Sequence, residues 1–192
     1  MAFQIKYYLC KIHFKLHKVY KYLTFLLVLI SFGFQQPNTY DVNSKFKAVF
    51  LYSFTRYFDW PEEKKTDAFV IYVVGKNDGL VAELKKNLSG KKKVGNQEIE
   101  IKNSPAFDPS ITSNIIYFAP DALKPVTDAA SKNKKKGVLI VAEAPGACKS
   151  GASINFIFLE NKLKFEYSKN AAVKAGLKTN EDFKALAEIN ID

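Results

Sequence analysis

The chain has 192 residues, of which 47% are hydrophobic and 25% charged, and it carries a formal net charge of +10. This length allows one domain of ordinary size, or one domain with a removable segment. The first 36 residues hold five lysines and no acid, so the remainder carries 24 basic and 19 acidic residues, a net charge of +5. Composition therefore argues against a nucleic-acid partner, because the remainder is only mildly basic and Arg56 is its only arginine.

The N-terminal segment has the pattern of a secretory signal. Its lysines precede an uncharged run at residues 23–34, LTFLLVLISFGF, and a signal peptide has a positive region followed by about 7–15 apolar residues. The run is shorter than the roughly 20 apolar residues of an ordinary membrane-spanning helix. Residues 1–36 are therefore predicted to be an export signal, with an uncleaved N-terminal anchor as the alternative. Residues 37–45 are polar and are predicted to be a flexible start.

The first element predicted after this start is an aromatic helix. Phenylalanines recur at every fourth position, at Phe46, Phe50, Phe54 and Phe58. Residues spaced by four lie on one face of a helix, so this face is expected to pack on a sheet, with Val49 and Tyr57 beside it. Pro61 is expected to end the helix, because the residue before a proline avoids helical geometry.

Packing of the predicted helix on a sheet does not require three other residues of the same stretch. Tyr52 and Arg56 are four apart on the flank of the predicted helix, and Trp60 is the only tryptophan in the chain. We expect these three side chains to face outward. They form the candidate partner surface, since aromatic residues are candidates for binding hot spots where the free protein exposes them.

Strands and helices are predicted to alternate over the middle of the chain. Three apolar runs are typical of buried strands: FVIYVVG at residues 69–75, NIIYFAP at 114–120 and GVLIVAE at 137–143. Helical spacing follows the first two runs, after the second over residues 121–134, and QEIEIK at residues 97–102 alternates as a further strand. Helices between buried strands predict a mostly parallel sheet with crossover connections.

The last third of the chain predicts an antiparallel hairpin instead. In ASINFIFLENKLKFEYS, residues 152–168, two alternating runs are separated by Glu160 and Asn161. Two short helices are expected after it, around Ala171 and at residues 180–189. The predicted fold class is therefore α/β: a single three-layer-like domain over residues 46–192, with a mostly parallel sheet, crossover helices and a C-terminal antiparallel β-hairpin.

Several catalytic chemistries are missing from the predicted domain. Both histidines, His13 and His17, lie in the first 36 residues, which excludes serine–histidine–aspartate triads, cysteine–histidine dyads and histidine metal sites from the domain. In GACKSGAS, residues 146–153, two glycines have the spacing of a phosphate-binding loop, but Ala152 occupies the position of its lysine. We therefore expect no enzyme activity, and no catalytic, cofactor-binding or metal-binding residues.

A small-molecule site is the alternative to a partner surface. If the three buried strands are parallel, the turns that follow them meet at one edge of the sheet, where α/β proteins form ligand crevices. The crevice residues would be Gly75, Asn77, Pro120, Pro145 and Gly146. A carrier or sensor of small molecules would bind its ligand there.

Four motifs occur in a fixed order along the chain: KAVFLYSFTRYFDWP at residues 47–61, FVIYVVGKND at 69–78, IIYFAP at 115–120, and VLIVAEAPGACKSGASINFIFLENKLKFEYSKNAAVKAGLK at 138–178. Together they resemble the YfiR-like family of exported bacterial proteins, over residues 45–190. The resemblance implies a compact periplasmic α/β domain without known catalysis. It also implies a partner, the periplasmic sensor domain of a membrane diguanylate cyclase or histidine kinase, through which cyclic di-GMP or related signalling is controlled.

The cysteines depart from the pattern of that family. Members of the characterised type carry paired cysteines that form disulfides, whereas Cys148 is the only cysteine after the predicted export signal. Control through internal disulfides is therefore not expected. A disulfide between the Cys148 thiols of two copies, and with it a homodimer, is the remaining redox alternative.

Overall fold

The computed structural model describes residues 42–122 and 124–191, so the predicted export signal and most of the predicted flexible start lie outside the described residues. Within these ranges, none of the helices combines the length and the apolar character that crossing a membrane requires.

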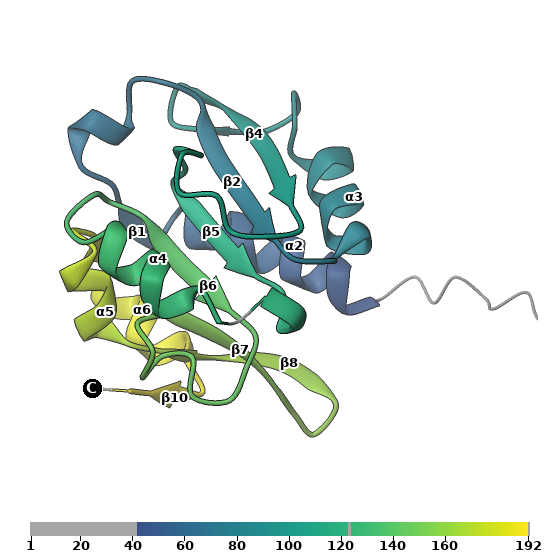
Figure 1. The fold of residues 1–192 in the computed structure, drawn as a ribbon, viewed down its shortest axis with the longest axis vertical. Helices are drawn as coiled ribbons and strands as arrows, with labels where there is room; N and C mark the ends of the chain where they lie inside the picture. Colours follow the sequence, from purple (N-terminus) through teal and green to yellow (C-terminus); the bar gives the residue numbers. More distant parts are fainter. Residues whose placement is uncertain (1–41, 123, 192) are drawn as a thin grey trace, which may run out of the picture. The chain divides into compact units, whose positions relative to one another are not determined.

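A mixed sheet of eight strands forms the centre of the described part of the chain (Figure 1). Its strands are β2 (Phe69–Val74), β3 (Lys93–Val94), β4 (Gln97–Ser104), β5 (Ile115–Phe118), β6 (Leu139–Ala142), β7 (Ile154–Leu159), β8 (Lys162–Tyr167) and β10 (Ile189–Asn190). Across the sheet their order is β10-β8-β7-β6-β5-β2-β4-β3. β2 pairs parallel with β4 and β5, and β6 pairs parallel with β5 and β7. The α/β class and the mostly parallel sheet are therefore confirmed.

The predicted C-terminal hairpin is also present. β7 and β8 pair antiparallel, from Ile154 opposite Tyr167 to Leu159 opposite Lys162. Glu160 and Asn161 form the turn between them, with φ angles of 51° and 59°. Positive φ at both positions is characteristic of the type I′ turn, whose twist matches that of the flanking strands.

Helices cover both faces of the sheet, which gives three layers (Figure 1). They are α2 (Val42–Phe54), α3 (Asp78–Asn87), α4 (Val126–Lys132), α5 (Lys169–Lys174) and α6 (Glu181–Leu186). α2 and α3 pack on the face that carries Ile71 and Val73 of β2. The opposite face carries Tyr72 and Val74, and α4 packs there. Since successive side chains of a strand point to opposite faces, β2 contributes to both cores.

The first helix differs from the prediction in its extent. α2 begins at Val42, inside the predicted flexible start, and ends at Phe54 rather than near Pro61. The backbone N–H groups of the next three residues each donate to a carbonyl three residues earlier, at 3.0–3.1 Å, which tightens the chain into a turn. The chain then forms β1 (Phe58–Asp59), which pairs antiparallel with β9 (Lys178–Thr179). This pairing is with a distant segment, which the helical spacing of the aromatics does not reveal.

The buried face of α2 also differs from the prediction. The residues that pack inward recur at three- and four-residue intervals, and they are Ser44, Lys47, Ala48, Leu51 and Phe54. Phe46 and Val49, which the spacing of the aromatics assigns to the core, are 52% and 56% exposed. The prediction is correct for Phe54 and Phe58, which are buried, and wrong for Phe46 and Val49. The helix turns these two outward because the polar residues Ser44 and Lys47 lie in the inward stripe, where a hydropathy pattern expects apolar ones.

Two later helices are shorter than predicted. The segment after β5 forms a 3₁₀ turn at Pro120–Ala122, and α4 starts only after Pro125, which lacks the N–H that would continue a preceding helix. At the C-terminal end, α6 stops at Leu186 and the chain extends into β10, which pairs parallel with β8.

Candidate functional site

The structure separates the three residues of the predicted partner surface. Arg56 is exposed, and its guanidinium carbon lies 5.7 Å from the ring centre of the half-buried Tyr52, a cation–π contact. Trp60 is only 4% exposed, so the expectation that it faces outward is wrong. Its indole Nε1 donates to the Asn114 carbonyl at 3.3 Å, and its ring meets that of Phe69 edge-on, with 5.0 Å between centroids. Trp60 thus anchors the segment after α2 to the sheet.

An apolar groove of about 370 Å³ lies between α2, β8 and α6. Its floor is made of three buried phenylalanines, Phe54, Phe165 and Phe183, whose ring centroids lie 5.3–5.7 Å apart. On its rim, Val49 is 56% exposed and Leu186 is 52% exposed. The groove therefore presents a packed aromatic floor beneath two apolar side chains that water reaches.

The outer side of α2 continues the surface of the groove. Val49, Tyr52 and Arg56 are three and four residues apart, so they lie on one side of the helical segment. Phe46, which is 52% exposed, precedes Val49 by three residues on the same side. We call the groove, together with Phe46, Tyr52 and Arg56, the groove face. It keeps two residues of the predicted partner surface and adds apolar residues that the sequence assigned to the core.

The predicted crevice residues do meet at one edge of the sheet, because β2, β5 and β6 end there in register. Gly75 has a φ of 98°, and a Cβ atom on it would lie 2.5 Å from Asp121 Oδ1, so this close approach requires glycine. Asn77 caps α3, since its side-chain oxygen accepts the Leu80 N–H at 3.1 Å. Both residues therefore have a local structural role at this edge.

The other three predicted crevice residues, Pro120, Pro145 and Gly146, are exposed in the turns after β5 and β6. None of the five predicted crevice residues lines the apolar groove, and none lines the polar cavity that lies between α4 and α5. The structure thus brings these residues to one edge without placing either of these two cavities among them.

A buried ion pair connects α2 to the same edge. Lys47 Nζ lies 2.7 Å from Glu143 Oε2, and the two side chains are 5% and 14% exposed. Tyr117 donates its hydroxyl to the same oxygen at 2.6 Å, and Asn77 Nδ2 donates to the Tyr117 hydroxyl at 3.5 Å. This network fixes the rotation of α2 and so decides which of its residues face outward. Sequence reasoning missed Lys47 and Glu143, although an acid directly after a buried strand was an available signal.

The thiol of Cys148 is free and buried. Its Sγ donates to the Glu166 carbonyl at 3.9 Å. Burial, and then the negative charge of Glu166, raises the pKa of the thiol from 9.0 to about 12. The thiol therefore stays protonated at neutral pH, which opposes the thiolate chemistry that an intermolecular disulfide needs. Across the described ranges, no three histidine, cysteine, aspartate or glutamate side chains are grouped so that they could hold a metal ion.

Comparison with known proteins places this geometry in a family. A family model described as YfiR/HmsC-like matches residues 44–188, a range that contains nearly all of α2, every strand of the sheet except β10, and α6. No curated protein matches the chain. Because the match covers most of the chain and both walls of the groove, the protein belongs to the YfiR/HmsC-like family.

Proposed function

We propose that this protein is a non-enzymatic periplasmic regulator that binds the periplasmic sensor domain of a membrane signalling protein, and that it does so through the groove face. The signalling protein is a diguanylate cyclase or a histidine kinase, so that binding controls cyclic di-GMP or related signalling. The YfiR-like family is a periplasmic regulatory family, which supports the general class. The observation that carries the proposal is the exposure of Val49 and Leu186 above an aromatic floor.

The composition of the groove face suits a protein partner. Interfaces have an apolar centre and a polar rim, and tyrosine and arginine are enriched among the residues that dominate binding. Phe46, Val49 and Leu186 supply exposed apolar area, and Tyr52 and Arg56 lie beside it. Burying one such apolar side chain contributes roughly 1.5–3 kcal/mol. A partner that covers these residues removes them from water, and this burial favours association.

The neighbouring strands favour a helix as the inserted part of the partner. β8 lines the groove, but β7 pairs with it on one side and β10 on the other. The Glu188 N–H donates to the Phe165 carbonyl at 3.0 Å, and the Ile191 N–H donates to the Tyr167 carbonyl at 2.8 Å. Because these backbone groups of β8 are occupied, addition of a strand there is disfavoured. A partner helix with apolar side chains at three- and four-residue intervals fits the groove instead.

The charges at the groove face predict the polar side of that helix. Lys164 and Glu188, at the wall of the groove, already form an ion pair at 2.7 Å. Arg56 makes no ion pair with any described residue and is exposed. An acidic side chain of the partner would therefore meet Arg56, where complementary charge increases the rate and the selectivity of association.

Capture of purified sensor domains tests the proposal. Periplasmic domains of candidate cyclases and kinases are immobilised and exposed to the exported protein, to the variant Val49→Ser/Leu186→Ser, and to the matched control Val173→Ser. Val173 is 60% exposed on α5 and does not line the groove, so its substitution removes a similar apolar side chain elsewhere.

The expected result is that at least one sensor domain captures the wild type and the Val173→Ser control but not the groove variant. If folded wild-type protein is captured by none of the domains, the regulatory proposal is wrong. If the groove variant is captured as well as the control, the partner binds elsewhere on the molecule.

A further inference from the structure

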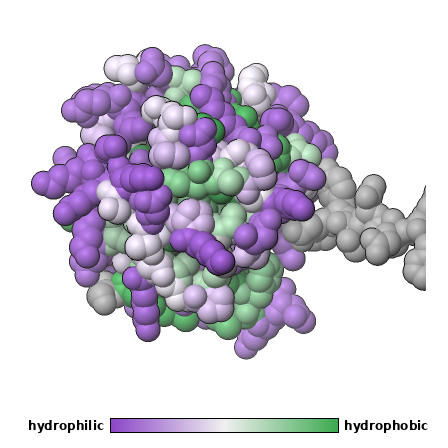
Figure 2. Space-filling model, in the orientation of Figure 1, coloured by the Kyte–Doolittle hydropathy of each residue, from purple (hydrophilic) through white to green (hydrophobic). Residues whose placement is uncertain are grey.

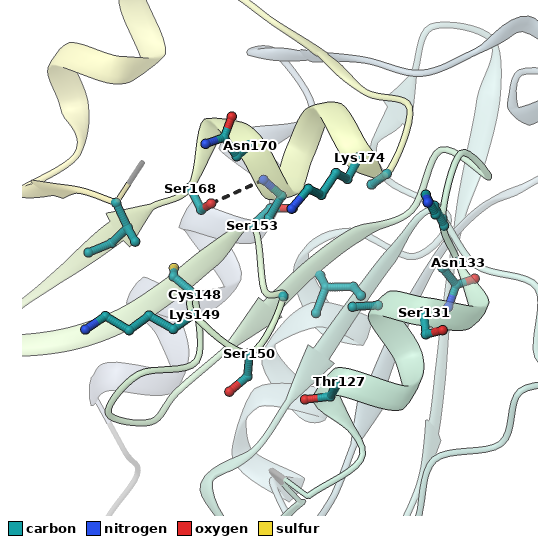
Figure 3. A pocket seen from close by; sticks show the side chains of 17 residues that line it. Thr127, Ser131, Asn133, Cys148, Lys149, Ser150, Ser153, Ser168, Asn170 and Lys174 are labelled. Carbon is teal, nitrogen blue, oxygen red and sulfur yellow. Dashed lines mark hydrogen bonds between the residues drawn. The ribbon is translucent and has the colours of Figure 1, made fainter.

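A second, polar cavity of about 620 Å³ lies between α4, α5 and the loop that follows β6 (Figure 3). Three lysines from separate segments line it: Lys134 after α4, Lys149 in the loop, and Lys174 at the end of α5. The cavity shares no lining residue with the apolar groove. It lies on the α4 side of the sheet, and on the face shown in Figure 2 hydrophilic side chains alternate with hydrophobic ones.

The charge of this cavity is uncompensated within the described part of the chain. No aspartate or glutamate is among its lining residues. Neighbouring lysines do have acidic partners, since Lys132 pairs with Asp128 at 2.9 Å and Lys169 pairs with Glu181 at 3.0 Å. Lys134, Lys149 and Lys174 form no such pair with any described residue. Three cations around one concave site create a positive potential that attracts anions.

Ser153 adds a hydroxyl group to the wall of the cavity. The residue is only 1% exposed, yet it lines the cavity. It precedes Ile154, which packs in the core on the α2 side, so alternation along the strand directs the Ser153 side chain to the cavity side. Its backbone N–H donates to the Ile140 carbonyl at 2.9 Å, and its carbonyl accepts the Ser168 N–H at 2.9 Å, so its backbone is fixed on both sides. The hydroxyl on this side chain can donate to an acceptor atom of a ligand in the cavity.

The remaining wall defines the body of the ligand. Ile140, Ala130, Ala171 and Ile191 give the cavity apolar surface between its polar groups. Lysine binds phosphate and carboxylate groups as a point charge, and ligand sites combine an apolar wall with a few placed polar groups. We propose that this cavity binds a small organic anion, with a phosphate or carboxylate group held by Lys174 and Ser153, with Lys134 and Lys149 adding to the positive potential, and with an apolar body on the wall.

This site is independent of the proposed partner. The groove face involves α2, β8 and α6, whereas the cavity involves α4, α5 and the loop after β6. Loss of anion binding would therefore leave capture of a sensor domain unchanged. Loss of capture would likewise leave anion binding unchanged. Each proposal fails or stands on its own measurement.

Calorimetric titration of the exported protein tests the site with four probes: phenyl phosphate, benzoate, inorganic phosphate and uncharged phenol. We expect phenyl phosphate or benzoate to bind at one site, more tightly than inorganic phosphate or phenol, and less tightly as ionic strength rises. The stronger of these two probes identifies the charged group. Lys149→Gln/Lys174→Gln is expected to weaken its binding by roughly tenfold, because it removes charge-assisted contacts.

Two variants separate binding from folding. Lys85→Gln/Lys86→Gln removes two exposed lysines from α3 and should leave anion affinity unchanged. Ser153→Ala should weaken binding, because it removes a hydrogen-bond donor to the anion, and urea unfolding of the same variant shows that the fold is intact. The proposal is overturned if no probe binds at millimolar concentration, if inorganic phosphate binds as tightly as phenyl phosphate, or if the cavity lysine variant binds like the control.

Discussion

Lys47 determines the orientation of the first helix. It is only 4% exposed although it is a lysine, and its ammonium group lies 2.7 Å from Glu143 Oε2. Because its side chain must point at the end of β6, the opposite side of α2, including Val49, turns outward. One buried charge pair thus connects the packing of the core to the composition of the groove face.

Breaking this pair should be costly, whereas removing both charges should not. Lys47→Met leaves the Glu143 carboxylate buried without its cation, and loss of one partner of a buried pair costs about 3–5 kcal/mol. The double variant Lys47→Met/Glu143→Gln is expected to recover most of that loss. Urea unfolding of both single variants, Lys47→Met and Glu143→Gln, and of the double variant measures these effects through the fluorescence of Trp60, the only tryptophan in the chain. Additive effects of the two single substitutions would show that the pair is not coupled.

Cys148 predicts a loss of stability in alkali. The folded protein holds the pKa of the thiol at about 12, and the ordinary value is 9.0. As the pH rises above the lower value, the unfolded chain loses this proton while the folded protein keeps it. The free energy of unfolding then falls by at most about 1.4 kcal/mol per pH unit, whereas well below that value this thiol contributes no pH dependence.

Comparison with Cys148→Ala isolates the thiol. Lysines and tyrosines also titrate in alkali, but their effects are common to both proteins and cancel in the difference. Urea unfolding at about pH 8 and about pH 10.5 should show that the wild type loses more stability than the variant. Equal losses would mean that the thiol is exposed to solvent in the folded protein.

At the scale of the elements, the sequence predicts most of the secondary structure but not the orientation of α2. Apolar runs and turn residues are local signals, and they predicted β2, β5, β6 and the β7–β8 hairpin. The face of α2 depends on Lys47 meeting Glu143, a contact between segments far apart in the chain. The burial of Trp60 depends likewise on Asn114. Such distant contacts leave no periodic pattern, so the groove face could not be derived from spacing alone.

The segment after α2 should stabilise the fold rather than bind the partner. Trp60→Phe removes the hydrogen bond to the Asn114 carbonyl and some of the packing on Phe69. The free energy of unfolding is expected to fall by about 1–3 kcal/mol. Circular dichroism during urea unfolding measures the change, since the fluorescent residue is absent. Capture by a sensor domain should be unaffected, and a selective loss of capture would return Trp60 to the partner surface.

The turn between β7 and β8 contains a residue that is unfavourable for its backbone conformation. Glu160 adopts a φ of 51°, a left-handed conformation that costs roughly 1–2 kcal/mol for residues other than glycine, asparagine and aspartate. Asn-Gly is the preferred pair for such a turn. Glu160→Asn/Asn161→Gly should therefore raise the free energy of unfolding by about 0.5–1 kcal/mol. As a control, Asn161→Ala places alanine at a φ of 59° and should lower the free energy of unfolding. An increase with this variant would contradict the assigned turn.

At the scale of the whole molecule, the sheet separates two surfaces of different chemistry. The apolar groove face involves α2, β8 and α6, and the cationic cavity involves α4 and α5. The order of the four motifs already predicted the family, because it is a signal that follows the chain. The two surfaces each combine side chains from three or more distant segments, which explains why neither was predicted as such.

The central claim is that the groove face binds the sensor domain, and calorimetric titration of that domain with three forms of the protein tests it most directly. Val49→Ser/Leu186→Ser should weaken binding by at least about tenfold, since burial of each apolar side chain contributes roughly 1.5–3 kcal/mol. Val173→Ser, a change at a similarly exposed valine outside the groove, should bind like the wild type. Equal affinity of the groove variant and the wild type would contradict the claim.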